Sequence, residues 1–166
     1  MLRRNERGAV AVEFALLLPL IVVFLFATIE FGLGLTKLED YENAAREGAR
    51  FTALHCPNSA TSPSCTPNDV WKVVRNASPD YVSNPNYTSV APTGACAGGT
   101  STVACAFKVC SGPIGGTQTC APAAASLNCT PSDAVTVSWQ QRFVFSVPFL
   151  SIAPRVRTIT GVFRCE

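Results

Sequence analysis

Residues 8–35 read GAVAVEFALLLPLIVVFLFATIEFGLGL, and this stretch decides the architecture of the chain. From residue 9 to residue 35 the run is apolar except for Glu13, Pro19, Thr28, Glu30 and two glycines. A helix of about 20 apolar residues is long enough to cross the hydrocarbon core of a bilayer, which is about 30 Å thick. The sequence therefore predicts a transmembrane helix over residues 9–35, with the lipid bilayer as its partner.

Charged residues on either side of this run predict its orientation in the membrane. Arg3, Arg4 and Arg7 lie in the basic segment 1–8, whereas Lys37 alone follows closely. Because positive charge is retained on the cytoplasmic side, we expect a cytoplasmic N-terminus and a distal region outside the cytoplasm.

A cleaved secretory signal peptide is the main alternative for the N-terminal segment. Such a peptide has a shorter apolar core, followed by a small-residue cleavage site. Here the apolar run is too long, and residues 31–44, FGLGLTKLEDYENA, contain no A-x-A site. We therefore expect the helix to be retained as a single membrane pass.

Cysteine is the most informative residue type beyond this helix. The chain has eight: Cys56, Cys65, Cys96, Cys105, Cys110, Cys120, Cys129 and Cys165. An even set on one side of a membrane segment predicts four disulfides in an oxidising compartment. Zinc or free thiols are the alternative, but there is no CxxC pair and His55 is the single histidine. Eight cysteines allow on the order of a hundred pairings, of which short loop closure suggests Cys56–Cys65 and Cys110–Cys120.

Two carboxylates interrupt the apolar run. Glu13 and Glu30 are seventeen residues apart, or roughly 25 Å along a helix. This separation can place both near opposite interfaces of a bilayer, where a charge costs less than at the centre. For Glu30 that interpretation suffices, whereas Glu13 has a second one because of the residues before it.

Residues 8–14, GAVAVEF, fit the type IV prepilin pattern of a glycine, four residues and a glutamate at the start of an apolar helix. The longer stretches RGAVAVEFALLLPLIVVFLFATIEFG (7–32) and NAAREGARFTAL (43–54) resemble the TadE family of pseudopilins from the Tad (Flp) pilus system. The end of the chain, GVFRCE, resembles the C-terminal strand of that family more weakly. The long cysteine-rich distal part departs from the commonest members.

The resemblance implies that a prepilin peptidase cuts between Gly8 and Ala9. Glycine suits an extended backbone in a narrow cleft, since it has no side chain. Glu13 then becomes the fifth residue of the mature chain and, with Phe14 beside it, serves subunit assembly. In pilins this glutamate pairs with the N-terminal amine of a neighbouring subunit, and in lipid such pairing offsets the cost of two bare charges.

The resemblance also implies a compartment and a set of partners. We expect the bacterial inner membrane, with the C-terminal domain periplasmic or extracellular. The expected partners are the prepilin peptidase, other Tad pilus subunits or pseudopilins, and the inner-membrane assembly platform. The net charge of +2 is too small to indicate nucleic acid binding, and we expect neither a cofactor nor a metal.

Residues 36–54 continue the helix as an extramembrane stalk. Apolar and small residues recur at steps of three and four, which places them on one narrow face: Leu38, Tyr41, Ala45, Gly48 and Thr52. Small residues permit the close approach of another helix or of a sheet. The partner is either another protein or the distal domain of the same chain.

The distal domain, residues 55–166, is predicted to be a small disulfide-rich head with an antiparallel sheet. We expect a short helix over 67–77, a strand over 102–110, a loop over 111–131 and a hairpin of strands 134–149 and 156–164. The first hairpin strand alternates apolar and polar residues with a period of two, and Gln141 interrupts its apolar side. The fold class is therefore α+β, with a pilin-like long helix and head.

No catalytic constellation is visible in the sequence. His55 sits at the expected helix end, and Asp69, Asp80 and Asp133 lie in separate polar contexts without the spacing of a carboxylate pair. We predict that the protein is not an enzyme. Two functions remain: a minor pseudopilin that assembles a Tad pilus, and a membrane-anchored binding module with no pilus role.

Overall fold

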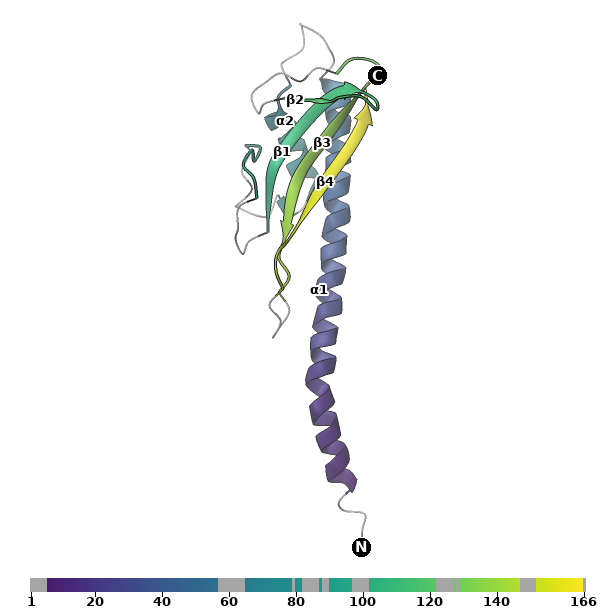
Figure 1. Cartoon of the computed structure of the whole chain (residues 1–166), viewed down its shortest axis with the longest axis vertical. Coiled ribbons are helices and arrows are strands. Elements are labelled where there is room, and N and C mark those ends of the chain that lie inside the picture. The colour runs from purple at the N-terminus through teal and green to yellow at the C-terminus, as the bar shows by residue number, and fades with distance from the viewer. Residues whose placement is uncertain are drawn as a thin grey trace.

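The computed structural model describes residues 6–56, 65–78, 80–81, 87, 90–96, 102–121, 127, 129–146 and 152–165. Its elements are α1 (Glu6–His55), α2 (Pro67–Ala77), β1 (Val103–Pro113), β2 (Thr119–Ala121), β3 (Asp133–Phe143) and β4 (Arg155–Arg164). One long helix carries a head at its C-terminal end, where an antiparallel sheet packs on it (Figure 1). The predicted α+β fold is confirmed.

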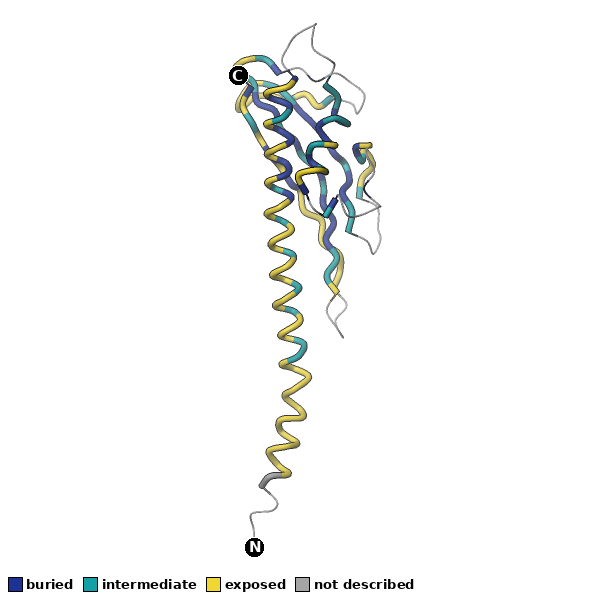
Figure 2. Tube along the Cα trace, turned by 180° about the vertical axis from the view of Figure 1, so that it is seen from behind, coloured by how far each residue is buried: buried dark blue, intermediate teal, exposed yellow. Residues whose placement is uncertain are grey.

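Helix α1 is a single helix of 50 residues, or about 75 Å at 1.5 Å per residue. Its N-terminal half is mostly exposed, whereas its C-terminal half lies along the head and is buried on the side that faces it (Figure 2). By length and composition it is one candidate membrane span. The helix ends at His55, one residue beyond the predicted end of the stalk.

The C-terminal half of α1 packs on the head of the same chain. Tyr41, Ala45, Gly48 and Thr52 are buried, and Leu38 is half-buried. Their cover is the inner face of β3 and β4, together with α2. Of the two partners considered for this face, the structure places the protein's own distal domain there.

Helix α2 has the bounds predicted from the sequence, because its first turn is specified locally. The backbone N–H of Thr66 donates to the Asp69 carboxylate over 3.2 Å, and the Thr66 hydroxyl donates to it over 2.8 Å. Lys72 lies 3.0 Å from the same carboxylate. The hydrogen bond from Lys72, followed by that from Thr66, lowers the pKa of Asp69 below its ordinary value. Pro67 at the first turn lacks an N–H that would have no partner there.

The sheet has the strand order β2-β1-β3-β4. The predicted β3–β4 hairpin is present, but β3 ends at Phe143 instead of continuing to residue 149. Phe143 pairs with Arg155, the first residue of β4. Pro154 precedes Arg155 and has no N–H with which to extend the ladder. Residues 147–151 of the predicted strand and turn lie outside the described residues.

The prediction of a loop over 111–131 is wrong for residues 111–113, which belong to β1, and for residues 119–121, which form β2. Strand β1 continues to Pro113, and the three-residue strand β2 pairs with it, with Cys110 opposite Cys120. These two cysteines form a disulfide. The sequence of β2 is too short for a periodic signal, and the covalent link between register partners holds it at the sheet edge.

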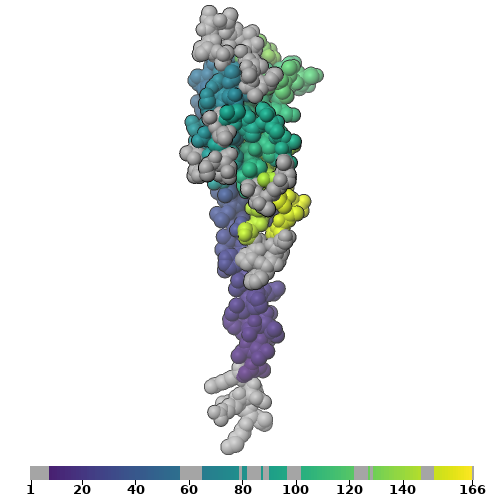
Figure 3. Space-filling view, turned by 90° about the vertical axis from the view of Figure 1, so that its left-hand side faces the viewer, coloured from purple at the N-terminus to yellow at the C-terminus, as the bar shows by residue number. Residues whose placement is uncertain are grey.

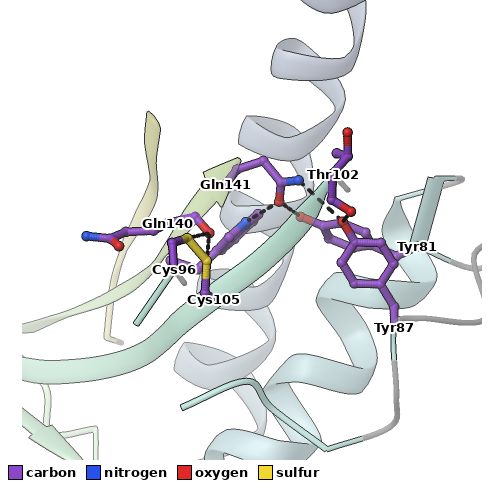
Figure 4. The surroundings of a disulfide bond; sticks show 8 residues. Tyr81, Tyr87, Cys96, Thr102, Cys105, Gln140 and Gln141 are labelled. Atoms are coloured by element: carbon purple, nitrogen blue, oxygen red, sulfur yellow. Dashed lines mark hydrogen bonds between the residues drawn. A yellow bond between two sulfur atoms is a disulfide. The ribbon is translucent and has the colours of Figure 1, made fainter. Parts of the chain in front are cut away.

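Gln141, which interrupts the apolar side of β3, is fully buried and hydrogen-bonded (Figure 4). Its Oε1 accepts from the Tyr81 hydroxyl over 2.7 Å and from the Trp139 indole N–H over 3.2 Å. Its Nε2 donates to the Tyr87 hydroxyl over 3.3 Å, and Tyr87 in turn donates to the Thr102 carbonyl. Gln141 is therefore the polar centre of an aromatic core.

Four disulfides connect all eight cysteines: Cys56–Cys65, Cys96–Cys105, Cys110–Cys120 and Cys129–Cys165. They include both pairs that short loop closure suggested. Cys129–Cys165 joins the approach to β3 with the end of β4, across 36 residues of sequence. Next to it, the Cys165 N–H donates to the Asp133 carbonyl over 2.9 Å.

Candidate functional site

The candidate site is the first part of α1, which contains Gly8, Ala9, Glu13 and Phe14. All four residues are exposed, and 61% of the Phe14 side chain is accessible. A Cβ built on Gly8 would meet no atom within 4 Å. Nothing in the described fold therefore requires a glycine at position 8, and the residue is free to meet a requirement set by another molecule. Residues 1–5 of the expected leader lie outside the described residues.

The Glu13 carboxylate has no ion-pair partner among the described residues, whose salt bridges all lie in the stalk and head. It projects from an exposed helix surface whose neighbours are apolar, including Val10 and Val12. A carboxylate within hydrocarbon is costly unless it lies near an interface or is paired. Any counter-charge for Glu13 within a membrane would therefore come from outside the part of this chain that the structure describes.

A large apolar surface surrounds this carboxylate. Many large side chains between residues 10 and 35 are about half exposed or more, among them Leu16 at 73%, Leu20 at 69% and Phe24 at 70%. Soluble monomers rarely expose contiguous apolar patches of more than a few hundred Å². This surface fits a lipid bilayer or apolar helices of other molecules.

A polar link fixes the stalk to the head just beyond the apolar run. The Asp80 carboxylate accepts a hydrogen bond from the Tyr41 hydroxyl over 3.1 Å and lies 3.3 Å from the Lys37 ammonium. The Tyr41 ring stacks on Tyr81 with centroids 5.0 Å apart. Burial, more than the nearby charge of Asp80, raises the pKa of the Tyr41 hydroxyl above its ordinary value. These contacts join the stalk to the head next to the apolar run.

The polar residues considered for catalysis have structural contacts. His55 is exposed, stacks on Phe51 and lies 3.3 Å from its carbonyl oxygen. Asp80 is held by the stalk, and the Asp133 carboxylate accepts a hydrogen bond from Thr130. Across the described ranges, no three histidine, cysteine, aspartate or glutamate side chains gather as metal ligands would.

Sequence patterns alone do not reveal the Asp80 link or the surroundings of Arg155 and Arg157. Both depend on contacts between segments far apart in the chain. For the two arginines, the sequence offers one local indication of a basic region beside apolar residues. The apolar segment 147–150 is followed by three arginines, the last of which is Arg164. In the structure Arg155 and Arg157 line the same groove along α1 as Glu30.

Comparison of the sequence with models of known protein families gives one match. The family model described as TadE-like protein matches residues 8–50, which cover the exposed half of α1 and most of the stalk. The resemblance seen in the sequence is confirmed over that range. TadE-like proteins are pilus assembly components and are not known as enzymes, so this match and the candidate membrane helix fit a protein associated with a Tad pilus. No curated protein and no solved structure matches the chain.

Proposed function

We propose that this chain, with its TadE-like segment at residues 8–50, is a minor pseudopilin of a Tad (Flp) pilus. In this proposal it is inserted in the bacterial inner membrane as a single-pass protein and is processed by a prepilin peptidase after Gly8. The observation that carries the proposal is Glu13. Its carboxylate has no ion-pair partner among the described residues, it lies on a bare apolar helix, and it stands five residues beyond a glycine whose Cβ position meets no atom within 4 Å.

The proposed division of the chain follows from this role. Residues 1–8 are the leader, 9–35 the transmembrane helix, 36–54 the stalk and 55–166 the cysteine-rich head. Arg3, Arg4 and Arg7 favour a cytoplasmic N-terminus. Four disulfides favour an oxidising compartment for the head, which is periplasmic or extracellular.

Processing at Gly8 and pairing at Glu13 belong to one mechanism. Cleavage creates an ammonium on Ala9, four residues from the Glu13 carboxylate of the same chain. Pairing this carboxylate with the new ammonium of a neighbouring subunit would offset the cost of both charges in lipid and set the register between subunits. The other proposed partners are Tad pilus subunits or pseudopilins and the inner-membrane assembly platform.

Replacement of Glu13 by Gln tests the assembly role. The variant keeps the shape of the side chain and removes its charge, so membrane insertion should persist while piliation falls sharply. Glu30→Gln is the matched control, because it removes the other carboxylate of the apolar run, and piliation should persist in it. Unchanged piliation in Glu13→Gln would instead favour the alternative of a membrane-anchored binding module with no pilus role.

A further inference from the structure

A groove of about 650 Å³ lies between α1 and the hairpin end, a name used here for the described residues 143–146 and 152–157 that flank the turn between β3 and β4. Glu30, Phe31 and Gly34 line it from the helix. Figure 3 shows described residues of the hairpin, in yellow-green and yellow, beside α1. The groove therefore marks the boundary between the head and the bare apolar helix.

The position of this groove along the helix axis, and hence its level relative to a bilayer, follows from the geometry of the helix. Glu30 lies 21 residues after Ala9, which is about 32 Å along an α-helix. The hydrocarbon core of a bilayer is about 30 Å thick. If the apolar run fills that core, the groove opens at the level of the lipid headgroups on the side of the head.

Close contacts hold the hairpin at this height. The rings of Phe31 and Phe145 stack with centroids 5.9 Å apart. A Cβ on Gly34 would lie 2.8 Å from Cε1 of Phe145, so the absence of a side chain at position 34 lets the ring approach the helix. The hairpin thus reaches the helix where the helix would leave the bilayer.

The exposed side chains of the hairpin end are of two kinds, basic and apolar, and both can bind a phospholipid surface. Ile152 and Val156 expose 37% and 47% of their surfaces. Arg155 and Arg157 are also exposed, and within the described part of the chain neither has an ion-pair partner, although the Glu30 carboxylate lines the same groove. Guanidinium groups bind phosphate oxygens with two parallel hydrogen bonds, and arginine stems can lie along apolar surface.

We propose that the end of the β3–β4 hairpin is a second membrane contact. Arg155 and Arg157 bind the phosphates of phospholipids in the leaflet facing the head, and Ile152 and Val156 lie among the headgroups. The contact rests on the proposed membrane insertion of α1 and adds to it a second point of attachment. Two points of attachment fix the tilt of the head relative to the bilayer, which one helix does not.

Lipid-dependent quenching of a new tryptophan tests this contact. The full chain carrying Val156→Trp is inserted into phosphatidylcholine vesicles that contain a headgroup spin-labelled lipid. Val162→Trp is the matched control. Val162 lies on the same strand, faces the same side of the sheet as Val156 and is 55% exposed. The native Trp71 and Trp139 are each only 1% exposed and give a constant background.

We expect at least twofold stronger quenching for Val156→Trp than for Val162→Trp. Adding Arg155→Gln and Arg157→Gln should reduce the quenching to the level of the control, whereas adding Arg164→Gln should leave it unchanged. Ile152→Trp is the second reporter if Val156→Trp does not fold. Equal quenching at positions 156 and 162, or quenching that does not depend on Arg155 and Arg157, would overturn the proposal.

Vesicle flotation separates this proposal from the one on which it rests. If the chain floats with the vesicles and its hairpin reporter is not quenched, only the second contact is wrong. If the chain does not float with the vesicles, the proposed membrane insertion fails, and the hairpin contact fails with it.

Discussion

Gly161 of β4 lies directly against the backbone of Ala45 in α1. A Cβ at position 161 would be 2.3 Å from the Ala45 carbonyl carbon and 2.4 Å from its oxygen. Because backbone atoms of a packed helix cannot move aside as a side chain can, only glycine fits at this crossing. The stalk and the sheet are therefore joined at backbone distance.

Substitution of Gly161 by Ala should separate the sheet from the stalk and destabilise the head. Overpacking of a buried site costs about 1–3 kcal/mol, and a clash with backbone places this variant at the upper end. Chemical denaturation of the detergent-solubilised chain measures the loss. Gly94→Ala is the control, since a Cβ there meets nothing within 4 Å. Equal stability of the two variants would contradict the contact.

Replacement of Gln141 by Leu should destabilise the head although it makes the core more apolar. It leaves the hydroxyl of Tyr81 and the indole N–H of Trp139 without their shared acceptor. A buried polar group without a partner costs about 1–3 kcal/mol. Denaturation measures the change, and Gln140→Leu on the opposite face of β3 should cost less. A Gln141→Leu variant as stable as the native chain would contradict this role.

Buried tyrosines should make the head unstable at alkaline pH. Burial raises the pKa values of Tyr41, Tyr81 and Tyr87 above the ordinary value of 10.0. Since the folded state holds these protons more tightly than the unfolded state, their stabilising contribution is fully present below about pH 10 and is lost as the pH rises further. The free energy of unfolding, measured from pH 8 to pH 11, should fall above pH 10. Tyr81→Phe should reduce the slope of that fall. An unchanged slope would argue against a contribution of Tyr81 to the loss of stability at alkaline pH.

Removal of the Cys129–Cys165 disulfide should cost more than removal of Cys110–Cys120. The two bonds close sequence separations of 36 and 10 residues. In the chain-entropy model the longer loop contributes about 1 kcal/mol more. Paired Cys→Ser variants, compared by denaturation under non-reducing conditions, measure the difference. A larger loss from the shorter loop would indicate that native packing, and not chain entropy, dominates.

Local patterns were sufficient for the elements that are specified locally. The apolar run and the three- and four-residue steps of the stalk predict α1, and Thr66 followed by Pro67 predicts the start of α2. Period-two alternation predicts β3, and β4 is predicted as the second strand of its hairpin. The end of β3 at Phe143 was missed, because it depends on where β4 begins to pair.

Long-range contacts account for the features that the sequence did not reveal. Gln141 looks like a defect in an apolar face until Tyr81 and Tyr87 are brought beside it. Arg155 and Arg157 look like ordinary surface charges until the hairpin folds back to Phe31. At the candidate site the spacing of Gly8 and Glu13 is local, so their roles in processing and assembly could be proposed from the sequence, and they stay a prediction.

Intact-mass and N-terminal analysis of the membrane-bound protein tests the proposed processing most directly. The chain is produced in a host with the cognate prepilin peptidase and in the same host without that enzyme. We expect Ala9 to be the first residue only where the peptidase is present, with the mass reduced by that of residues 1–8. A membrane-bound chain that retains Met1 to Gly8 in the presence of the peptidase would contradict the proposal.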